Sequence, residues 1–324
     1  MSDLLHRFIF LGSADDERAA PVRGSLVQLD QSWQALLQRG HYPPAVAALL
    51  GEAAVAAVLL GATLKIDGKL TLQLMSEQTP TEGEGDVEGN SHGAKETPLA
   101  VHLLVMQVTS NRELRGLARW HGETSPDADA AQGLQLVQGG RLVMTIETAR
   151  GERYQGVVAL EGDSLAQALQ GYFARSEQLA TRLWLQADAQ HAAGLLVQKM
   201  PEHHAESDEE DWTRVQALAD TVTREELLAL PAENLLRRLF HEEDRRMYDA
   251  EPVRFKCSCS RERVEEMLRN LGIAEIESIL AEQGSIEVDC EFCNAKFRFD
   301  RVDAAALFAA LPHVGSHAPS SRLH

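Results

Sequence analysis

Cysteine is nearly absent from this chain: the first 256 residues contain none, and all four cysteines lie between positions 257 and 293. Four cysteines in 324 residues are too few for a scaffold held together by disulfides. A chain of this length can bury a large hydrophobic core without such cross-links. We therefore expect a folded protein of about two domains, with the cysteines gathered in one local site.

Positive charge is also scarce. The chain has 31 Lys and Arg residues against 49 Asp and Glu residues, a net charge of -18, and no run of Lys and Arg forms a basic patch. Phosphate backbones and anionic membrane surfaces repel such a chain. The composition argues against nucleic acids and membranes as partners, and it favours solubility.

Export and membrane signals are not recognisable. The N-terminal segment has no basic stretch followed by a long apolar one, so we expect no signal peptide and a reducing cytoplasm around the thiols. The stretch from Ala45 to Leu64 is long enough to span a bilayer, but it is Ala-rich and contains Glu52. We interpret it as the buried central helix of a soluble domain, preceded by Pro43 and Pro44.

The first two-thirds of the chain alternates strand-like and helix-like segments. This pattern predicts an α+β fold, with a mixed sheet-and-helix core over residues 1–201. Residues 76–97 are rich in Gly, Glu, Ser and Thr, and we predict a disordered loop insertion there. The expected helices are Gln31 to Arg39, Ala45 to Leu64 and a helix that Asp163 caps and that ends near Ala174. The expected strands are Leu4 to Leu11, Gly24 to Leu29, Lys69 to Leu74, Leu99 to Thr109, Glu113 to Arg119, Arg141 to Thr148, Tyr154 to Leu160, Thr181 to Gln186 and Ala193 to Met200.

Charged amphipathic helices are expected over residues 202–254, which we predict to be a linker. Its first ten residues form an acidic run that also contains two histidines. Thr223 and Glu226 are spaced as a capping box, and Pro231 interrupts the helical pattern. Two apolar stripes recur at helical spacing. They consist of Trp212, Val215, Leu218, Ala219 and Val222, and of Leu227, Leu228, Leu235, Leu236, Leu239 and Phe240.

These stripes have two interpretations. Spacing alone favours ordinary docking onto the core. However, short charged helices are marginally stable in water and need support from neighbouring structure. A change in the C-terminal module could therefore release them, which would make the stripes a conditional interaction surface.

The four cysteines form two close pairs, Cys257-Ser-Cys259 and Cys290-Glu-Phe-Cys293, separated by 30 residues. Four thiolates match the ligand set of a tetrahedral structural zinc site, so we predict one Zn²⁺ per chain held by all four. The same pairs are also close enough to form two local disulfides. Metal-bound and oxidised states would exclude each other.

We place the cysteines in a small module, residues 255–311, followed by a disordered tail at 312–324. The module is predicted to contain helices from Arg261 to Asn270, around Glu275 to Glu282 and from Val302 to Leu311, with strands at Ile286 to Val288 and Phe297 to Phe299. Its core is too small to stand alone, whereas zinc stabilises zinc-finger peptides by roughly 10–16 kcal/mol. Oxidation of one pair removes two ligands, and such short disulfide loops restrict the unfolded chain little. Oxidation should therefore unfold the module, although spacing alone favours a purely structural zinc.

The chain resembles the redox-regulated 33-kilodalton heat-shock chaperones, which are bacterial holdases. The resemblance covers nearly the whole chain, but residues 76–97 are longer than expected. It rests on Gly151-Glu-Arg-Tyr-Gln-Gly156 with Val157 and Val158, Tyr172-Phe173, Ser176-Glu-Gln-Leu179 and Thr181, Phe255, Cys257, Cys259, Ser260 and Arg263, and Asp289-Cys290, Phe292-Cys293, Phe297 and Phe299.

The resemblance implies a switch. It implies that the reduced, zinc-bound chain is inactive, and that oxidation forms the disulfides Cys257–Cys259 and Cys290–Cys293 with loss of zinc. It further implies that the linker then loses structure, that the chain binds unfolding clients, that the active form is a homodimer, and that clients pass to an ATP-dependent foldase. The chain itself has no phosphate-binding motif of the form G-x-x-x-x-G-K-[ST], and we expect no enzymatic activity.

Two other functions remain possible from the residues. One is a zinc-ribbon module that binds nucleic acid or another partner through a purely structural zinc, which the net charge disfavours. The other is a thiol-disulfide oxidoreductase that uses Cys290 and Cys293. Such motifs usually lie at a helix N-terminus, whereas this pair follows a predicted strand.

Overall fold

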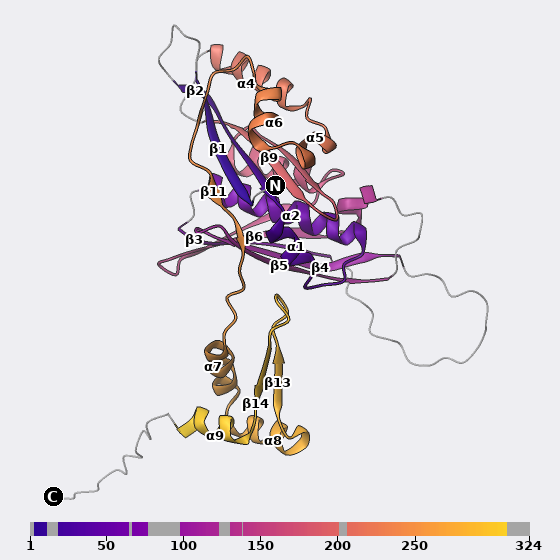
Figure 1. Ribbon diagram of the computed structural model, residues 1–324, viewed down its shortest axis with the longest axis vertical. Coiled ribbons are helices and arrows are strands. Elements are labelled where there is room, and N and C mark those ends of the chain that lie inside the picture. Colours follow the sequence, from indigo (N-terminus) through magenta and orange to yellow (C-terminus); the bar gives the residue numbers. More distant parts are fainter. Residues whose placement is uncertain are drawn as a thin grey trace, which may run out of the picture. The chain divides into compact units, whose positions relative to one another are not determined.

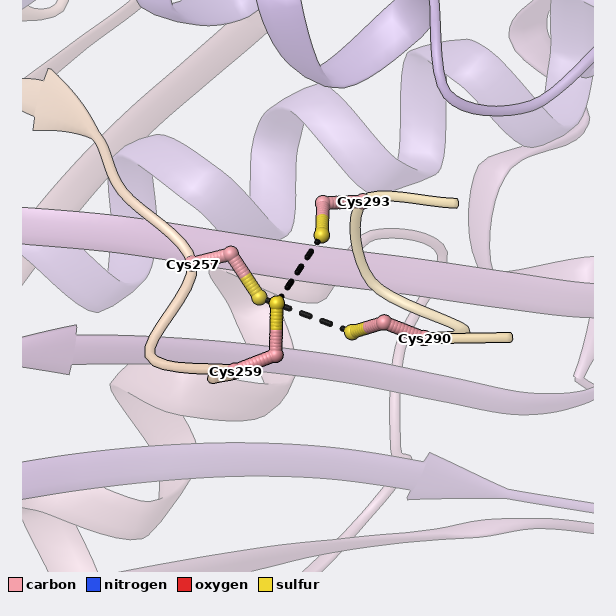
Figure 2. Close-up of side chains that lie close together, drawn as sticks. All are labelled: Cys257, Cys259, Cys290 and Cys293. Atoms are coloured by element: carbon pink, nitrogen blue, oxygen red, sulfur yellow. Dashed lines mark hydrogen bonds between the residues drawn. The ribbon is translucent and has the colours of Figure 1, made fainter. Parts of the chain in front are cut away.

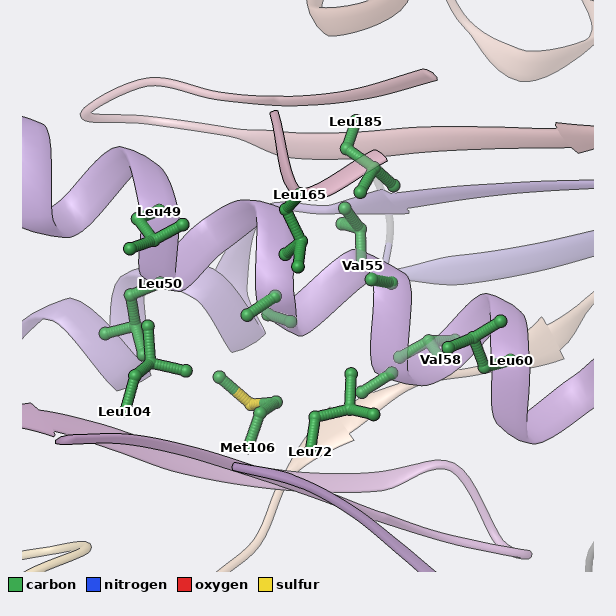
Figure 3. Packing of buried hydrophobic residues seen from close by; sticks show 14 of the residues in the cluster. Leu49, Leu50, Val55, Val58, Leu60, Leu72, Leu104, Met106, Leu165 and Leu185 are labelled. Atoms are coloured by element: carbon green, nitrogen blue, oxygen red, sulfur yellow. The ribbon is translucent and has the colours of Figure 1, made fainter. Parts of the chain in front are cut away.

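The Ala-rich apolar stretch forms helix α2, Pro44–Thr63, with a proline in its first turn. Its apolar residues point in all directions rather than along one stripe, so it needs apolar partners on every side. By length and composition the helix could cross a membrane, but 89% of its 18-residue window is buried inside the structure. Figure 3 shows its side chains packing toward strands on opposite sides. The predicted central helix is confirmed.

The computed structural model describes residues 3–11, 19–64, 67–76, 98–122, 130–137, 139–200 and 206–309. These residues form the predicted mixture of sheets and helices (Figure 1). The chain divides into two compact units, residues 1–256 and 257–324. The predicted insertion at 76–97, apart from residue 76, and the tail at 312–324 lie outside the described residues.

One sheet of the first unit, called the linker-side sheet below, has the strand order β10-β1-β2-β9-β8, with β11 also pairing with β1. All its pairings are antiparallel. Its strands are β1 (Leu4–Leu11), β2 (Ala19–Leu29), β8 (Thr181–Ala187), β9 (Ala192–Lys199), β10 (Arg245–Met247) and β11 (Glu251–Pro252).

Both faces of the linker-side sheet are apolar, because successive side chains of a strand point to opposite faces. On one face, residues such as Leu5, Val27 and Leu196 join the core around α2. On the other face, a second cluster contains Phe8, Phe10, Val22, Leu26, Ala193, Leu195 and Val197. The consecutive apolar residues 195–197 are typical of a strand buried on both sides.

The other sheet has the order β12-β5-β4-β3-β6-β7 and packs against the opposite side of α2. Only the edge pair, β12 with β5, is parallel among its pairings. Its strands are β3 (Gly68–Met75), β4 (Ala100–Thr109), β5 (Glu113–His121), β6 (Arg141–Thr148), β7 (Arg153–Ala159) and β12 (Arg254–Phe255). The remaining elements of the unit before the linker are α1 (Gln31–Leu37), the 3₁₀ helix η1 (Ala130–Leu136), α3 (Leu165–Tyr172) and the π-helical turn η2 (Phe173–Glu177).

The cap of α3 corrects one prediction. Ser164, not Asp163, is the N-cap: its backbone is extended and its Oγ accepts a hydrogen bond from the Gln167 backbone at 3.2 Å. Asp163 stands one residue too early, and its own backbone N–H donates to the Gln167 side chain at 2.7 Å. The α-helical hydrogen bonding also ends at Tyr172, before the predicted end at Ala174, because η2 follows.

Three short helices of the predicted linker cover the second apolar face of the linker-side sheet. They are α4 (Glu206–Ala219), α5 (Arg224–Ala229) and α6 (Ala232–Leu239). The predicted capping box of Thr223 and Glu226 is present, and Pro231 separates α5 from α6. The chain then runs along β1 as β10 and β11 (Figure 1). These two strands were not predicted, because they are too short to show alternation.

The second unit is described from Cys257 to Ala309. Helices α7 (Arg261–Leu271), α8 (Ile273–Gln283) and α9 (Arg301–Ala309) surround the hairpin of β13 (Ile286–Asp289) and β14 (Lys296–Phe299). All five predicted elements are present, with bounds that differ by one or two residues. Their buried core is small, comprising Leu268, Ile276, Leu280, Ile286, Phe299, Ala304 and Leu307.

Candidate metal centre

The first cysteine pair lies on the segment between β12 and α7. Ser260 caps α7 through a hydrogen bond that its Oγ accepts from the Arg263 backbone at 3.4 Å. The Arg263 side chain turns back and donates to the Ser258 carbonyl at 2.6 Å. The helix start thus fixes the backbone that carries Cys257 and Cys259.

The second pair occupies the turn of the β13–β14 hairpin. The backbone N–H of Cys290 donates to the Ala295 carbonyl at 2.9 Å, which closes the turn. The Cys290 carbonyl accepts from the backbones of Cys293 at 3.2 Å and Asn294 at 2.7 Å. Asn294 takes the left-handed conformation, with φ of 58°, that Asn tolerates better than most residues. The tight turn brings both sulfurs of this pair to one side.

All four thiols converge, as Figure 2 shows. Each Sγ lies within 4.8 Å of the other three, and all four cysteines are partly exposed and unbridged. The sulfurs of Cys257 and Cys290 are 3.6 Å apart, and those of Cys259 and Cys293 are 3.3 Å apart. Four sulfurs about 2.3 Å from a tetrahedral zinc ion would be about 3.8 Å from one another. The residues present therefore fit a four-thiolate zinc site.

The thiols affect one another's acidity. Burial opposes ionisation of Cys257, but hydrogen bonds from the Cys259 backbone and the other three thiols lower its pKa to about 7. Burial raises the pKa of Cys259, and its thiol neighbours raise it further. Burial likewise raises the pKa of Cys293. Without a cation, four adjacent thiolates repel one another, so the cluster needs a positive ion in order to ionise fully.

Around the cluster, Arg261 connects several parts of the unit. Its guanidinium lies 4.2 Å from the ring centroid of Phe299 and donates to the Arg298 carbonyl at 3.0 Å. It also forms an ion pair with Asp303 at 2.9 Å. These contacts join α7 to β14 and α9. This role of Arg261 was not predictable from the sequence beyond its place in the first turn of a predicted helix.

The predicted stripe residues of the linker are not free in this structure. Trp212, Val215, Leu227, Leu228, Leu235, Leu236, Leu239 and Phe240 are buried against the linker-side sheet, and Leu218 and Val222 are partly buried there. Phe240 packs on Phe10, with ring centroids 5.0 Å apart, and on Phe8 at 6.1 Å. Helical spacing in the sequence predicted only the helix side of this contact. Its sheet side could have been found from strands that are apolar on both faces.

Comparisons with known proteins identify the family to which the four-cysteine cluster and the fold of this chain belong. The model of the family described as "Hsp33 protein" matches residues 3–94 and 94–300. The "33 kDa chaperonin" of Nitrosococcus oceani is 48% identical over 306 residues, covering 94% of each chain. That of Ectopseudomonas mendocina is 45% identical over 329 residues, covering 100% of each. A crystal structure of the 33 kDa chaperonin from Thermotoga maritima matches the fold, with a TM-score of 0.72 at 20% identity over 93% of this chain and 97% of that one.

Proposed function

Because this chain belongs to the Hsp33 family of redox-regulated holdases with a C-terminal four-cysteine zinc site, we propose that its Cys257, Cys259, Cys290 and Cys293 are both the zinc ligands and the redox centres. The family is one of chaperones rather than enzymes. The observation that carries the proposal is the convergence of the four sulfurs within 4.8 Å. Bound Zn²⁺ would keep the thiols ionised and would supply folding energy to the small second unit.

Oxidation acts on these same sulfurs. A thiolate attacks peroxide and becomes a sulfenic acid, and the neighbouring thiol then displaces water to form the disulfide. Each pair gives two electrons to one peroxide. A closed pair offers two ligands fewer, so the cluster can no longer hold a tetrahedral ion. The second unit then keeps only its small apolar core.

The pairing within each motif, Cys257–Cys259 and Cys290–Cys293, is part of the proposal. Close sulfur contacts also join the two motifs in the folded cluster, at 3.3 and 3.6 Å, so proximity in the reduced state does not by itself select the local pairs. Unfolding of the second unit would select the local pairs. Thiols two or three residues apart stay close in a disordered chain, whereas the two motifs, 30 residues apart, separate.

Client binding would then follow from release of the linker. We propose three functional parts: a core over residues 1–201, a linker over 202–254 and a switch over 255–311. Strand β12 lies at the boundary between the linker and the switch and ends two residues before Cys257. It pairs with β5, and Arg254 and Lys256 form ion pairs with Glu113 at 2.6 and 2.8 Å. Exposed ion pairs of this kind contribute little. Release of α4 to α6 would expose the apolar cluster that includes Phe8, Phe10 and Phe240.

Finer features of the family pattern are also proposed here. The oxidised chain would pair as a homodimer through newly exposed apolar surface, work in the cytoplasm and pass its clients to an ATP-dependent foldase. Support comes from the resemblance and from thiols that need a reducing compartment. Sedimentation of reduced and oxidised chains tests the dimer.

Disulfide mapping combined with hydrogen exchange tests the switch itself. After peroxide treatment at mildly raised temperature, peptide mass spectrometry should find the two local disulfides, with one zinc released per chain. Backbone protection over residues 206–240 should fall, while that of α2 remains. Cross-motif disulfides, or unchanged protection of the linker, would refute the proposed sequence of events.

A further inference from the structure

A cavity of about 290 Å³ lies outside the metal centre, where β1, β2 and β9 meet the C-terminal end of α2. Its polar lining includes Arg7, Arg23 and Ser25, and its apolar lining includes Ile9, Leu196 and Tyr248. The volume approaches the range of small-molecule sites, which are mostly apolar with a few polar groups. In a chain of net charge -18, two arginines in one cavity indicate an anionic ligand.

Arg23 has no carboxylate partner among the described residues. Its guanidinium donates to the amide oxygen of Gln198, at 3.0 Å from Nε, and to the Thr63 carbonyl at 3.4 Å. Both acceptors are neutral groups, and the second is a helix-terminal carbonyl with a partial negative charge. Removal from water lowers the pKa of Arg23, as expected of a cation that lacks a counter-ion.

Arg7 is only partly compensated. Its Nη2 pairs with Glu251 at 2.5 Å, but Glu251 also pairs with Arg112 at 2.9 Å. The Arg7 Nε is buried and has no hydrogen-bond partner among the described residues. Buried donors normally have acceptors, so this one leaves capacity for an additional acceptor.

One wall of the cavity belongs to the linker. Tyr248 follows β10, donates its backbone N–H to the Arg7 carbonyl at 2.9 Å, and has its ring centroid 5.7 Å from the Arg7 guanidinium carbon. The cavity is therefore complete only while the strand after α6 lies on β1. A ligand that fits it would bind the docked state and not the released one.

We propose that this cavity binds a small amphipathic anion, with one phosphate or carboxylate group and an aromatic or aliphatic body, and that its occupancy holds β10 and Tyr248 against β1. The anionic group pairs with Arg7 and Arg23, and the body contacts Ile9, Leu196 and Tyr248. The second half rests on the proposed function, because a ligand that holds the strand opposes linker release.

Binding is tested first, without reference to chaperone activity. Phenyl phosphate, inorganic phosphate and phenol are titrated at constant ionic strength into the reduced, zinc-loaded full-length chain, and amide NMR shifts are followed. Phenyl phosphate should bind with a dissociation constant on the order of 1 mM, and each of the other two at least about tenfold more weakly. Arg7→Gln and Arg23→Gln should each weaken binding by about 10- to 100-fold. Arg112→Gln is the matched control, because this substitution also removes an ion pair with Glu251, whereas Arg112 does not line the cavity.

The outcomes are distinct. Loss of binding in both cavity variants with retention in Arg112→Gln supports the site; equal binding in all variants, or tighter binding of phenol, overturns it. At ten times the dissociation constant, phenyl phosphate should slow peroxide activation of the native chain by about tenfold and leave Arg23→Gln unaffected. Binding without slowing would overturn the effect on the strand. The ligand-free chain run in parallel shows separately whether the oxidation switch itself operates.

Discussion

The two faces of the linker-side sheet carry the same kind of side chain but are covered in different ways. One face packs on α2, a 20-residue helix that is apolar on every side and buried between two sheets. The other packs on three helices of 14, 6 and 8 residues whose outer surfaces are charged. Burial of similar apolar area can thus be permanent or conditional. The difference lies in whether the covering element has other partners.

Helix α2 cannot leave, because both sheets hold it. Helices α4 to α6 have apolar contacts on one side only, and side-chain hydrogen bonds and ion pairs add to their attachment to the sheet. The Gln28 side chain donates to the Leu230 carbonyl at 2.7 Å, and Arg224 donates to the Ala187 carbonyl at 2.6 Å. Short helices with one supporting face depend strongly on what holds their ends.

The largest expected effect concerns the metal. Chelating zinc from the reduced chain, or replacing all four cysteines with Ser, should unfold residues 257–309 while the core around α2 stays folded, because a stabilisation on the order of 10–16 kcal/mol is lost. Hydrogen exchange measured separately over the two units checks this. Ser258→Ala, between two of the cysteines, is the control and should keep its protection. Persistent protection of α7 to α9 in the metal-free chain would contradict the metal dependence.

The next effect compares the two faces directly. Phe240→Ala should lower the free energy of unfolding by about 3–5 kcal/mol, and Leu50→Ala in α2 should lower it by a similar amount, about 2–5 kcal/mol. Only Phe240→Ala should loosen the linker, so only this variant should suppress client aggregation while reduced and zinc-loaded, at a temperature below its global unfolding. Equal activity of the two variants would mean that general destabilisation, not the linker face, creates the client surface.

The next prediction concerns the pH dependence of stability and a residue of α2, the helix that covers the permanently buried face of the sheet. Removal from water raises the pKa of Glu52, in α2, to about 7, although Arg224 pulls it down. The folded state therefore holds a proton that the unfolded state has lost between about pH 4.5 and 7, so this group's contribution to stability falls as pH rises through that window. Glu52→Gln should raise the free energy of unfolding by about 3 kcal/mol at pH 8 and by little at pH 4.5. Urea unfolding at both pH values measures this, and a pH-independent effect would exclude titration of Glu52 as its cause.

The smallest effect concerns the attachment of β12. Glu113→Gln removes the ion pairs to Arg254 and Lys256 and should cost less than about 1 kcal/mol. The loss should shrink further at 1 M salt, where such pairs are screened. Hydrogen exchange at residues 253–256 reports it. A loss of several kcal/mol would show that this strand, rather than the helix face, holds the linker.

The sequence was sufficient for much of the fold and for the composition of the site. Apolar length identified α2, and the spacing of Cys257, Cys259, Cys290 and Cys293 identified the cluster. Features that depend on contacts distant in sequence were not predictable. Strand β10 has three residues and takes its conformation from pairing with Phe8 to Phe10, and the second apolar face of the sheet becomes evident only when the strands are placed side by side.

Chemistry also limited the site prediction. Spacing alone left structural zinc, a redox switch and an oxidoreductase open, since thiolates serve in all three. The structure places Cys290 and Cys293 in a hairpin turn rather than at a helix N-terminus, which disfavours an oxidoreductase site. The choice of disulfide partners is a property of the oxidised chain and remains a prediction.

Light scattering from a thermally aggregating client would decide whether the cluster controls chaperone activity. The client is heated with the reduced, zinc-loaded chain or with the chain after peroxide treatment at mildly raised temperature. We predict that the native chain suppresses scattering only after oxidation. Peroxide should not change the level of suppression by the variant in which all four cysteines are replaced with Ser. Equal suppression by the reduced and oxidised native chain would contradict a switch and would leave a constitutive chaperone with a structural zinc.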